Sequence, residues 1–245
     1  NYQGDVGLHI AKCLWACKYP EFTSKVTGGK GHVNTRSLHE KMEFLAKNYV
    51  VGNRAYKSDK KAKEEILKIN RLIYSQDPEI KDLWRKTRQW SLDYFEKIYK
   101  RVYTHFDRYY FESEVAQAGK KIVLQALKKG IFKKSKGAII FPGSKYGLHD
   151  RVFVTQEGNP TYEAKDVELA RLQFKEYNPD LIIHNVGPEQ SGYFKVIFKA
   201  LEQVFPYTKD KEYHLMYGWV RLKKGKMSSR LGNLVLGEDV LNEAK

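Results

Sequence analysis

Residues 181–190 read Leu-Ile-Ile-His-Asn-Val-Gly-Pro-Glu-Gln, and the expected fold follows from this stretch. Its first six residues are mainly apolar and rich in β-branched side chains, and turn-forming pairs containing proline lie on both sides. This pattern predicts a buried strand of a parallel sheet. Ligands of such sheets bind at the carboxyl ends of the strands, so residues 187–190 are expected to form a ligand-contacting loop.

The second half of the chain alternates between strand and helix patterns on either side of this stretch. Strands are predicted at 137–141 and 151–154, helices at 162–177 and 191–205, and an extended segment at 214–222. This alternation is typical of an α/β fold with a parallel sheet.

The first half has helical patterns throughout. Helices are predicted at 5–16, with Asp5 as the capping residue, at 34–49, and at 58–74, with Ser58 as the cap. Asp77 followed by Pro78 predicts the start of a long amphipathic helix, since proline is favoured at the first helical position. Its apolar stripe is Ile80, Leu83, Trp84, Thr87, Tyr94, Phe95, Ile98, Tyr99 and Val102.

The composition points to an anionic partner. The 245 residues carry a net charge of +15, and two stretches, 115–149 and 221–231, contain lysines and arginines but no carboxylate. A solvated basic face explains any single run, whereas two such runs favour a surface that contacts phosphates. No apolar run is long enough to span a membrane and no signal peptide is evident, so a cytoplasmic protein is expected.

The only two cysteines, Cys13 and Cys17, are four residues apart and do not form a disulfide framework. Together with His9 they would lie along one helix face, but no fourth ligand has the usual spacing. Buried thiols in a core helix are therefore expected, and no structural metal is predicted.

Five segments resemble motifs of the arginyl-tRNA synthetase family, in family order. The family patterns are Gly-Asp-Trp-Gly, Phe-Asp-x-Tyr-x-x-Glu-Ser, Asp-Arg-Val followed by Gly-x-Pro-Thr-Tyr, Val-Gly-x-Glu-Gln and the Lys-Met-Ser-Lys loop. The matching segments are residues 4–7, 106–113, 150–162, 186–190 and 226–229. Val6 stands in place of the family tryptophan, and Ser229 in place of the second loop lysine. The resemblance implies a class I synthetase catalytic domain with a Rossmann-like parallel sheet.

The resemblance assigns roles to the last of these segments. In the family this loop closes on ATP, and its cations stabilise the negative charge of the departing pyrophosphate. The catalytic candidates are accordingly Lys226, Ser228, Ser229 and Arg230. Whether Arg230 replaces the missing lysine is left open. Lys226, Met227 and His214 are the candidates for binding ATP, which would bring magnesium with it.

The family also uses a Tyr, an Asp and a Gln to hold arginine, and these match Tyr162, Asp166 and Gln190. Tyr162 and Asp166 are four residues apart at a helix start and would share a face. A guanidinium presents five donors in a planar fork, which a carboxylate and neutral acceptors suit. For Asp166 the alternative is an ordinary helix-start carboxylate. Glu112 could add a second carboxylate or could have a structural role.

The resemblance also implies a division of the chain. Residues 1–136 would be mainly helical and include an inserted helical region, and residues 137–245 would be the α/β half that ends in the signature loop. The family's His-x-Gly-His motif would precede Asn1, and the anticodon-binding helices would follow Lys245. The chain is thus expected to be a catalytic fragment with little activity of its own.

The expected activity is ATP-dependent joining of arginine to its tRNA, with a monomer favoured. By resemblance, such enzymes usually need bound tRNA before they activate arginine. Two alternatives remain: another class I synthetase, such as a cysteinyl or glutamyl enzyme, and a basic RNA-binding module without chemistry. A cysteinyl enzyme should carry more zinc-ligating cysteines than two. An RNA-binding module would need no arginine pocket.

Overall fold

The computed structural model describes residues 1–19, 37–218 and 237–243, and the chain divides into two compact units. We call them the helical unit, which holds the described residues among 1, 3–109 and 221–245, and the α/β unit, which holds those among 2 and 110–220. The division expected at residues 136 and 137 concerns parts of the family fold and stays a prediction.

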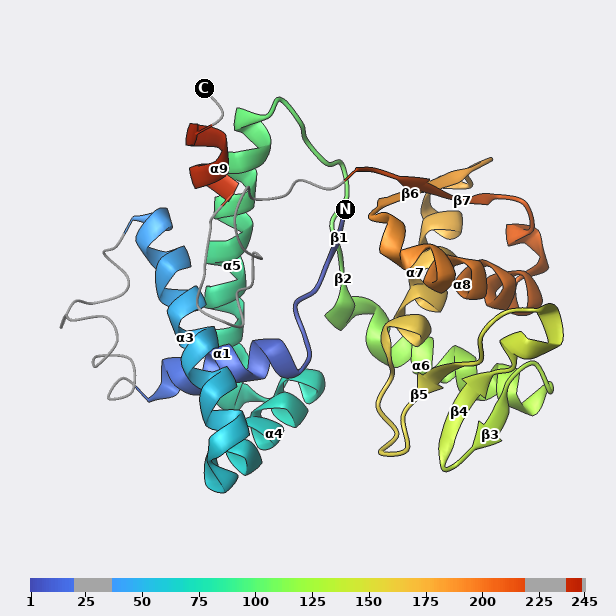
Figure 1. Ribbon diagram of the computed structural model, residues 1–245, viewed down its shortest axis with the longest axis horizontal. Coiled ribbons are helices and arrows are strands. Elements are labelled where there is room, and N and C mark those ends of the chain that lie inside the picture. The colour runs from blue at the N-terminus through green and yellow to red at the C-terminus, as the bar shows by residue number, and fades with distance from the viewer. Residues whose placement is uncertain (20–36, 219–236, 244–245) are drawn as a thin grey trace. The chain divides into compact units, whose positions relative to one another are not determined.

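The described residues of the helical unit are mostly helical (Figure 1). Its described helices are α1 (Leu8–Lys18), α3 (Leu38–Ser58), α4 (Lys60–Ser75), α5 (Pro78–Arg101) and α9 (Gly237–Glu243). The short strand β1 (Tyr2–Gln3) precedes α1. The predicted start of α5 is confirmed, because the Asp77 carboxylate accepts a hydrogen bond from the Glu79 amide at 2.9 Å.

Two of the predicted helix caps are wrong. Ser58 is the last residue of α3, and Asp59 caps α4 by accepting a hydrogen bond from the Ala62 amide at 3.0 Å. Asp5 does not cap α1, which begins three residues later. Its buried carboxylate instead pairs with Arg88 of α5 at 2.7 Å. An ion pair with a residue 83 positions away overrides the local capping preference.

The apolar stripe of α5 is buried in part. Its described core positions include Ile80, Trp84, Thr87 and Tyr94, and Trp90 is buried as well. At the far end of the stripe Phe95 and Val102 are exposed. Cys13 and Cys17 are half-buried rather than buried. No helix in the described ranges is long and apolar enough to cross a membrane.

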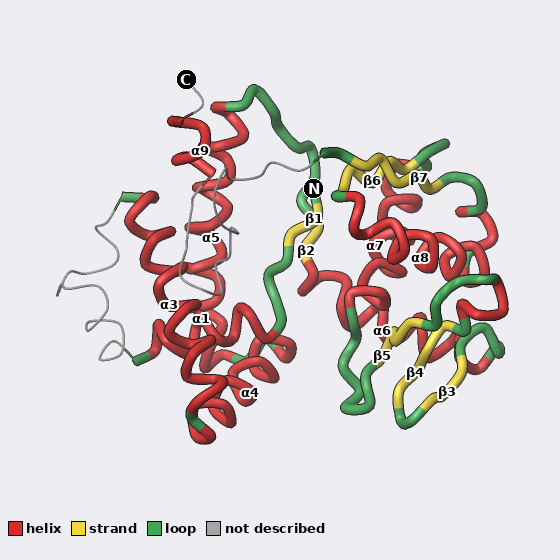
Figure 2. Tube along the Cα trace, viewed as in Figure 1, coloured by secondary structure: helices red, strands yellow, loops and turns green. Residues whose placement is uncertain are grey.

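The α/β unit mixes helices with short strands (Figure 2). Its helices are α6 (Glu112–Lys128), α7 (Tyr162–Tyr177) and α8 (Ser191–Val204), with 3-10 turns η2 (Gly143–Tyr146), η3 (Pro188–Gln190) and η4 (Pro206–Thr208). Its strands are β2 (Tyr110–Phe111), β3 (Lys133–Ser135), β4 (Ala138–Phe141), β5 (Arg151–Val154), β6 (Ile182–Val186) and β7 (Glu212–Met216). The helices predicted at 162–177 and 191–205 and the strand at 151–154 are confirmed within a residue.

Strands β3 to β7 form two sheets of different kinds, and β2 pairs with β1 instead. β3, β4 and β5 pair antiparallel in that order, whereas β6 and β7 pair parallel, with His184 opposite His214. The predicted parallel strand is therefore confirmed, but its predicted burial is wrong, since Ile183 is 56% exposed. Side chains alternate between the two faces of a strand, and one face of β6 has no described neighbour covering it.

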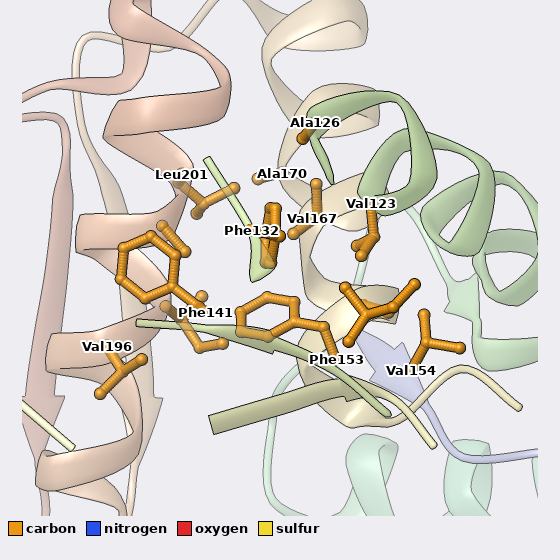
Figure 3. Packing of buried hydrophobic residues seen from close by; sticks show 14 residues of the cluster. Val123, Ala126, Phe132, Phe141, Phe153, Val154, Val167, Ala170, Val196 and Leu201 are labelled. Atoms are coloured by element: carbon orange, nitrogen blue, oxygen red, sulfur yellow. The ribbon is translucent and has the colours of Figure 1, made fainter. Parts of the chain in front are cut away.

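The largest apolar cluster of the α/β unit joins its helices to the antiparallel sheet (Figure 3). Three phenylalanines from separate segments, Phe132, Phe141 and Phe153, meet with ring centroids 4.8 to 6.3 Å apart. Val167 of α7 and Leu201 of α8 pack against them. The buried face of α7 in this cluster fixes the orientation of the helix, and thus the direction of the residues at its start.

Gly119 of α6 lies at the closest approach of α6 to α7. A Cβ atom added there would meet the Ala164 carbonyl oxygen at 2.0 Å, and a backbone atom cannot swing away as a side chain can. We expect Gly119→Ala to lower the free energy of unfolding by about 3 kcal/mol or more, since overpacking in a core typically costs about 1–3 kcal/mol. Urea denaturation checks this. Gly192→Ala is the control: nothing lies within 4 Å of its added Cβ in α8, and stability should stay level or rise slightly.

Candidate functional site

The predicted arginine-binding residues centre on the first turns of α7. The preceding segment is fixed because the Thr161 hydroxyl donates to the Val152 carbonyl oxygen at 2.8 Å, which ties the helix start to β5. Tyr162 is 55% exposed at the first helical position, and Asp166 is half-buried one turn later. An open aromatic ring thus precedes a sheltered carboxylate on the same helix face.

Asp166 is held by α8. The Tyr193 hydroxyl donates to the Asp166 carboxylate at 2.6 Å. Burial raises the pKa of Asp166 to about 7, and the neighbouring carboxylates of Glu163 and Glu112 push it in the same direction, whereas the Tyr193 hydrogen bond and His184 lower it. A cationic ligand bound beside Asp166 would therefore strongly favour the ionised form of this carboxyl group.

Tyr193 is itself supported by Arg151 of β5. The Arg151 guanidinium lies over the Tyr193 ring, 5.0 Å from its centroid, and donates to the Glu163 carboxylate at 2.9 Å. Burial and the adjacent Asp166 carboxylate raise the pKa of Tyr193 well above its usual range, so its hydroxyl keeps the proton that it donates. The Arg151 contacts therefore fix the ring that orients Asp166.

Glu112 and Lys165 form a buried ion pair behind this face. Their charged groups are 2.7 Å apart, and each side chain is only 4% exposed. The Lys165 ammonium also lies 4.8 Å from the centre of the Tyr162 ring. Since the Glu112 carboxylate already has a cation beside it, the structural role considered for Glu112 has a direct physical basis.

The histidines of β6 and β7 both have fixed ring orientations. His184 Nε2 lies 2.6 Å from the Glu212 carboxylate, and His214 Nε2 lies 3.0 Å from the Val186 carbonyl oxygen. A carbonyl oxygen only accepts, so His214 Nε2 carries a proton. Its Nδ1 is then the ring nitrogen left for a ligand. The His214 ring also packs on Phe194, with centroids 4.7 Å apart.

The structure links some of the predicted residues and not others. Glu112 and Tyr162 both contact Lys165, and Asp166 contacts Tyr193 and is affected electrostatically by Glu112. Gln190 is exposed at the end of η3 and has no described side-chain contact to them. The predicted loop residues lie outside the described part of the chain. These are Lys226, Met227, Ser228, Ser229 and Arg230.

Sequence reasoning missed the residues that support Asp166 and Tyr162. Tyr193 is 27 positions from Asp166, and Lys165 is 53 positions from Glu112, so no local spacing connects them. One available signal was Lys165 itself, a cation on the face of α7 that its apolar neighbours Ala164 and Val167 mark as buried. A buried cation requires a buried anion, which predicts a partner without naming it.

Comparison with known proteins identifies the family. A profile described as tRNA synthetases class I (R), catalytic domain, matches residues 29–245. The chain belongs to this family. It is 31% identical to an arginine–tRNA ligase of Porphyromonas gingivalis and 30% identical to one of Borreliella afzelii, over 99% and 98% of this chain. It spans only 42% and 41% of those two relatives, so it corresponds to part of a full enzyme of this kind.

Solved structures agree on the fold of this synthetase domain. An arginyl-tRNA synthetase from Plasmodium falciparum matches with a TM-score of 0.61 over 85% of this chain and 34% of that one. A putative arginyl-tRNA synthetase from Campylobacter jejuni matches with a TM-score of 0.64 over 99% and 50%. Both are 17% identical in sequence. The fold is thus the class I synthetase α/β fold with a mostly helical N-terminal half, as the motifs predicted.

Proposed function

We propose that this synthetase domain provides the arginine site and part of the ATP site of an enzyme that joins arginine to its tRNA. The observation that carries the proposal is the carboxyl of Asp166, sheltered and oriented by Tyr193, one turn after the exposed ring of Tyr162. The carboxylate would pair with the guanidinium, the Tyr162 hydroxyl would add a neutral contact, and Gln190 would add another from the loop after β6.

The proposed chemistry needs no protein nucleophile. The arginine carboxylate would attack the α-phosphorus of ATP and displace pyrophosphate, and a ribose hydroxyl of the terminal tRNA adenosine would then attack the carbonyl carbon and displace AMP. Positioning and charge stabilisation supply the rate enhancement for both steps. We assign charge stabilisation to Lys226, Ser228, Ser229 and Arg230, and ATP contacts to Lys226, Met227 and His214.

We propose that magnesium enters with ATP, bound to its phosphates. In the described ranges no group of three or more His, Cys, Asp or Glu side chains could hold a metal ion. The basic composition, with a net charge of +15, supports the tRNA as the macromolecular partner. The free cysteines fit a reducing compartment, and we place the activity in the cytoplasm.

Arginine binding by this chain tests the site directly. Calorimetric titrations with arginine and with citrulline, a neutral ligand of nearly the same shape, should show at least about tenfold tighter binding of arginine, because a hydrogen bond to a charged group is worth about 1.5–3 kcal/mol. Equal affinity for the two ligands would favour the RNA-binding module without an amino acid site. The complete reaction is tested in the full-length protein by pyrophosphate exchange with arginine, ATP and the tRNA.

Arginine affinity should depend on pH through Asp166. Its pKa is about 7 in the free protein, and a bound guanidinium would lower that pKa, so binding below pH 7 must release a proton. Affinity should therefore fall about tenfold per pH unit below 7, which is about tenfold at pH 6 and about a hundredfold at pH 5, and level off above pH 8. Titrations in two buffers with different ionisation enthalpies would count the released proton. A flat profile between pH 5 and 8 would exclude Asp166 as the guanidinium partner.

A further inference from the structure

A pocket lies at the opposite end of α7 from the proposed arginine site. It has a volume of about 310 Å³ and is lined by Arg171, Phe174, Lys175, Asn178, Tyr207 and Lys211. This volume is at the lower end of the roughly 300–1,000 Å³ typical of small-ligand sites. Asp166 and Lys175 are nine residues apart on the helix, or about 13 Å along its axis, so the two sites are separate.

The charges around this pocket are unbalanced. Three cationic side chains and no carboxylate line it among the described residues. Arg171 forms a bidentate ion pair with the Glu168 carboxylate, at 2.6 and 2.7 Å, which neutralises its charge. Lys175 and Lys211 form no ion pair with any described residue, and the Lys211 ammonium lies 6.0 Å from the centre of the Phe174 ring. Two unpaired cations facing one small space would attract an anion.

The rest of the pocket is formed by two aromatic rings and one side-chain amide. Tyr207 is 50% exposed, and its ring is held in place by an edge contact with Phe174 at 5.4 Å and by stacking on Phe205 at 5.5 Å. Asn178 is the C-terminal capping residue of α7 and has a left-handed backbone conformation. Its side-chain amide can both donate and accept hydrogen bonds. A fixed, half-open ring beside a polar amide suits a planar base that carries hydrogen-bonding edges.

We propose that this pocket binds a nucleoside monophosphate unit, either free or within a single RNA strand. Lys175 and Lys211 would contact the phosphate, Tyr207 would stack on the base, and Asn178 would contact its edge. Helix-dipole stabilisation accounts for Lys175 in the last turn of α7, but it explains neither Lys211, which lies outside the helix, nor the exposed ring.

Calorimetric titration of the full chain with AMP and with inorganic phosphate tests the assignment. The variant Lys175→Ala/Lys211→Ala should weaken AMP binding about tenfold or more, since each phosphate contact is charge-assisted. The control Lys121→Ala/Lys195→Ala removes two exposed lysines of the same unit that lie outside the pocket, and it should bind AMP as wild type does. Tyr207→Leu should weaken AMP binding several-fold and leave phosphate binding unchanged, and Asp166→Asn should change neither.

Crosslinking with 8-azido-AMP locates the bound nucleotide independently of affinity, and the expected adducts lie in the peptide that contains Tyr207 and Lys211. Comparison of AMP with the trinucleotide ApApA identifies the source: tighter binding of ApApA indicates an RNA strand, and equal binding indicates a free nucleotide. AMP binding that is equal in wild type and both lysine variants would overturn the proposal. Phosphate and AMP binding with equal affinity, unaffected by Tyr207→Leu, would overturn it too, because it would show a simple anion site.

Discussion

Asp166→Asn is expected to weaken arginine binding about tenfold to several hundredfold while ATP parameters stay near wild type. The substitution keeps the size of the side chain and its contact with the Tyr193 hydroxyl, and it removes only the charge. A hydrogen bond to a charged group is worth about 1.5–3 kcal/mol, and leaving a partly buried cation unpaired costs more. Exchange kinetics on the full-length enzyme, varying arginine and ATP separately, measure the effect on kcat/KM.

Measuring the stability of Asp166→Asn shows whether a loss of arginine binding comes from the missing charge or from a destabilised fold. Because the pKa of Asp166 is raised in the folded chain, the stability that it contributes is present at low pH and is lost as pH rises through about 7. Asp166→Asn should therefore unfold at the same or a higher urea concentration than wild type at pH 8. Asp180→Asn makes the same chemical change at an exposed loop position, and it should alter neither arginine binding nor stability in urea. Wild-type arginine kinetics in Asp166→Asn would leave Asp166 as an ordinary helix-start carboxylate.

Tyr162→Phe and Gln190→Ala should affect the same arginine parameter less, because each removes a neutral contact. Lys226→Ala should show the opposite profile, with slower adenylate formation and nearly unchanged arginine binding. Whether a substitution affects arginine binding or the rate of adenylate formation, rather than the size of either effect, distinguishes an amino acid site from a nucleotide site.

Substitutions in the Glu112–Lys165 ion pair are expected to cause the largest losses in the free energy of unfolding. Removing one partner of a buried ion pair typically costs about 3–5 kcal/mol, because the other charge stays buried without compensation. Glu112→Gln and Lys165→Met should each lower the free energy of unfolding by about this amount in urea denaturation. The double variant Glu112→Leu/Lys165→Met should recover most of the loss, since it replaces both charges with apolar groups of similar volume.

Arginine titrations of these variants decide between the two roles of Glu112. A structural carboxylate predicts that both single variants lose stability by similar amounts and that the double variant binds arginine nearly as wild type does. If Glu112 contacted the guanidinium, the double variant would be stable but would bind arginine poorly. A double variant as unstable as the single ones would show that the pair is not the main contact of either residue.

The features that could be predicted from the amino-acid sequence are those that depend on neighbours within a few residues. Asp77 with Pro78 fixes the start of α5, because the carboxylate caps the amide two residues later and proline needs no hydrogen bond there. The boundaries of α7 and β5 were predictable for the same reason, since turn residues stop the backbone hydrogen bonding at both ends. The family motifs then indicated the fold and the residues at the start of α7.

The contacts of those side chains could not be predicted, because they depend on how distant segments pack. Asp5 is of a residue type that commonly caps helices, but it pairs with Arg88 instead. Asp166 accepts its hydrogen bond from Tyr193 on another helix. The raised pKa of Asp166 likewise comes from burial and from charges on other elements, which the sequence does not place around it. Local patterns specify backbone conformation, because its hydrogen bonds join near neighbours, whereas the partner and the charge state of a buried polar group depend on which distant segments the apolar core brings together.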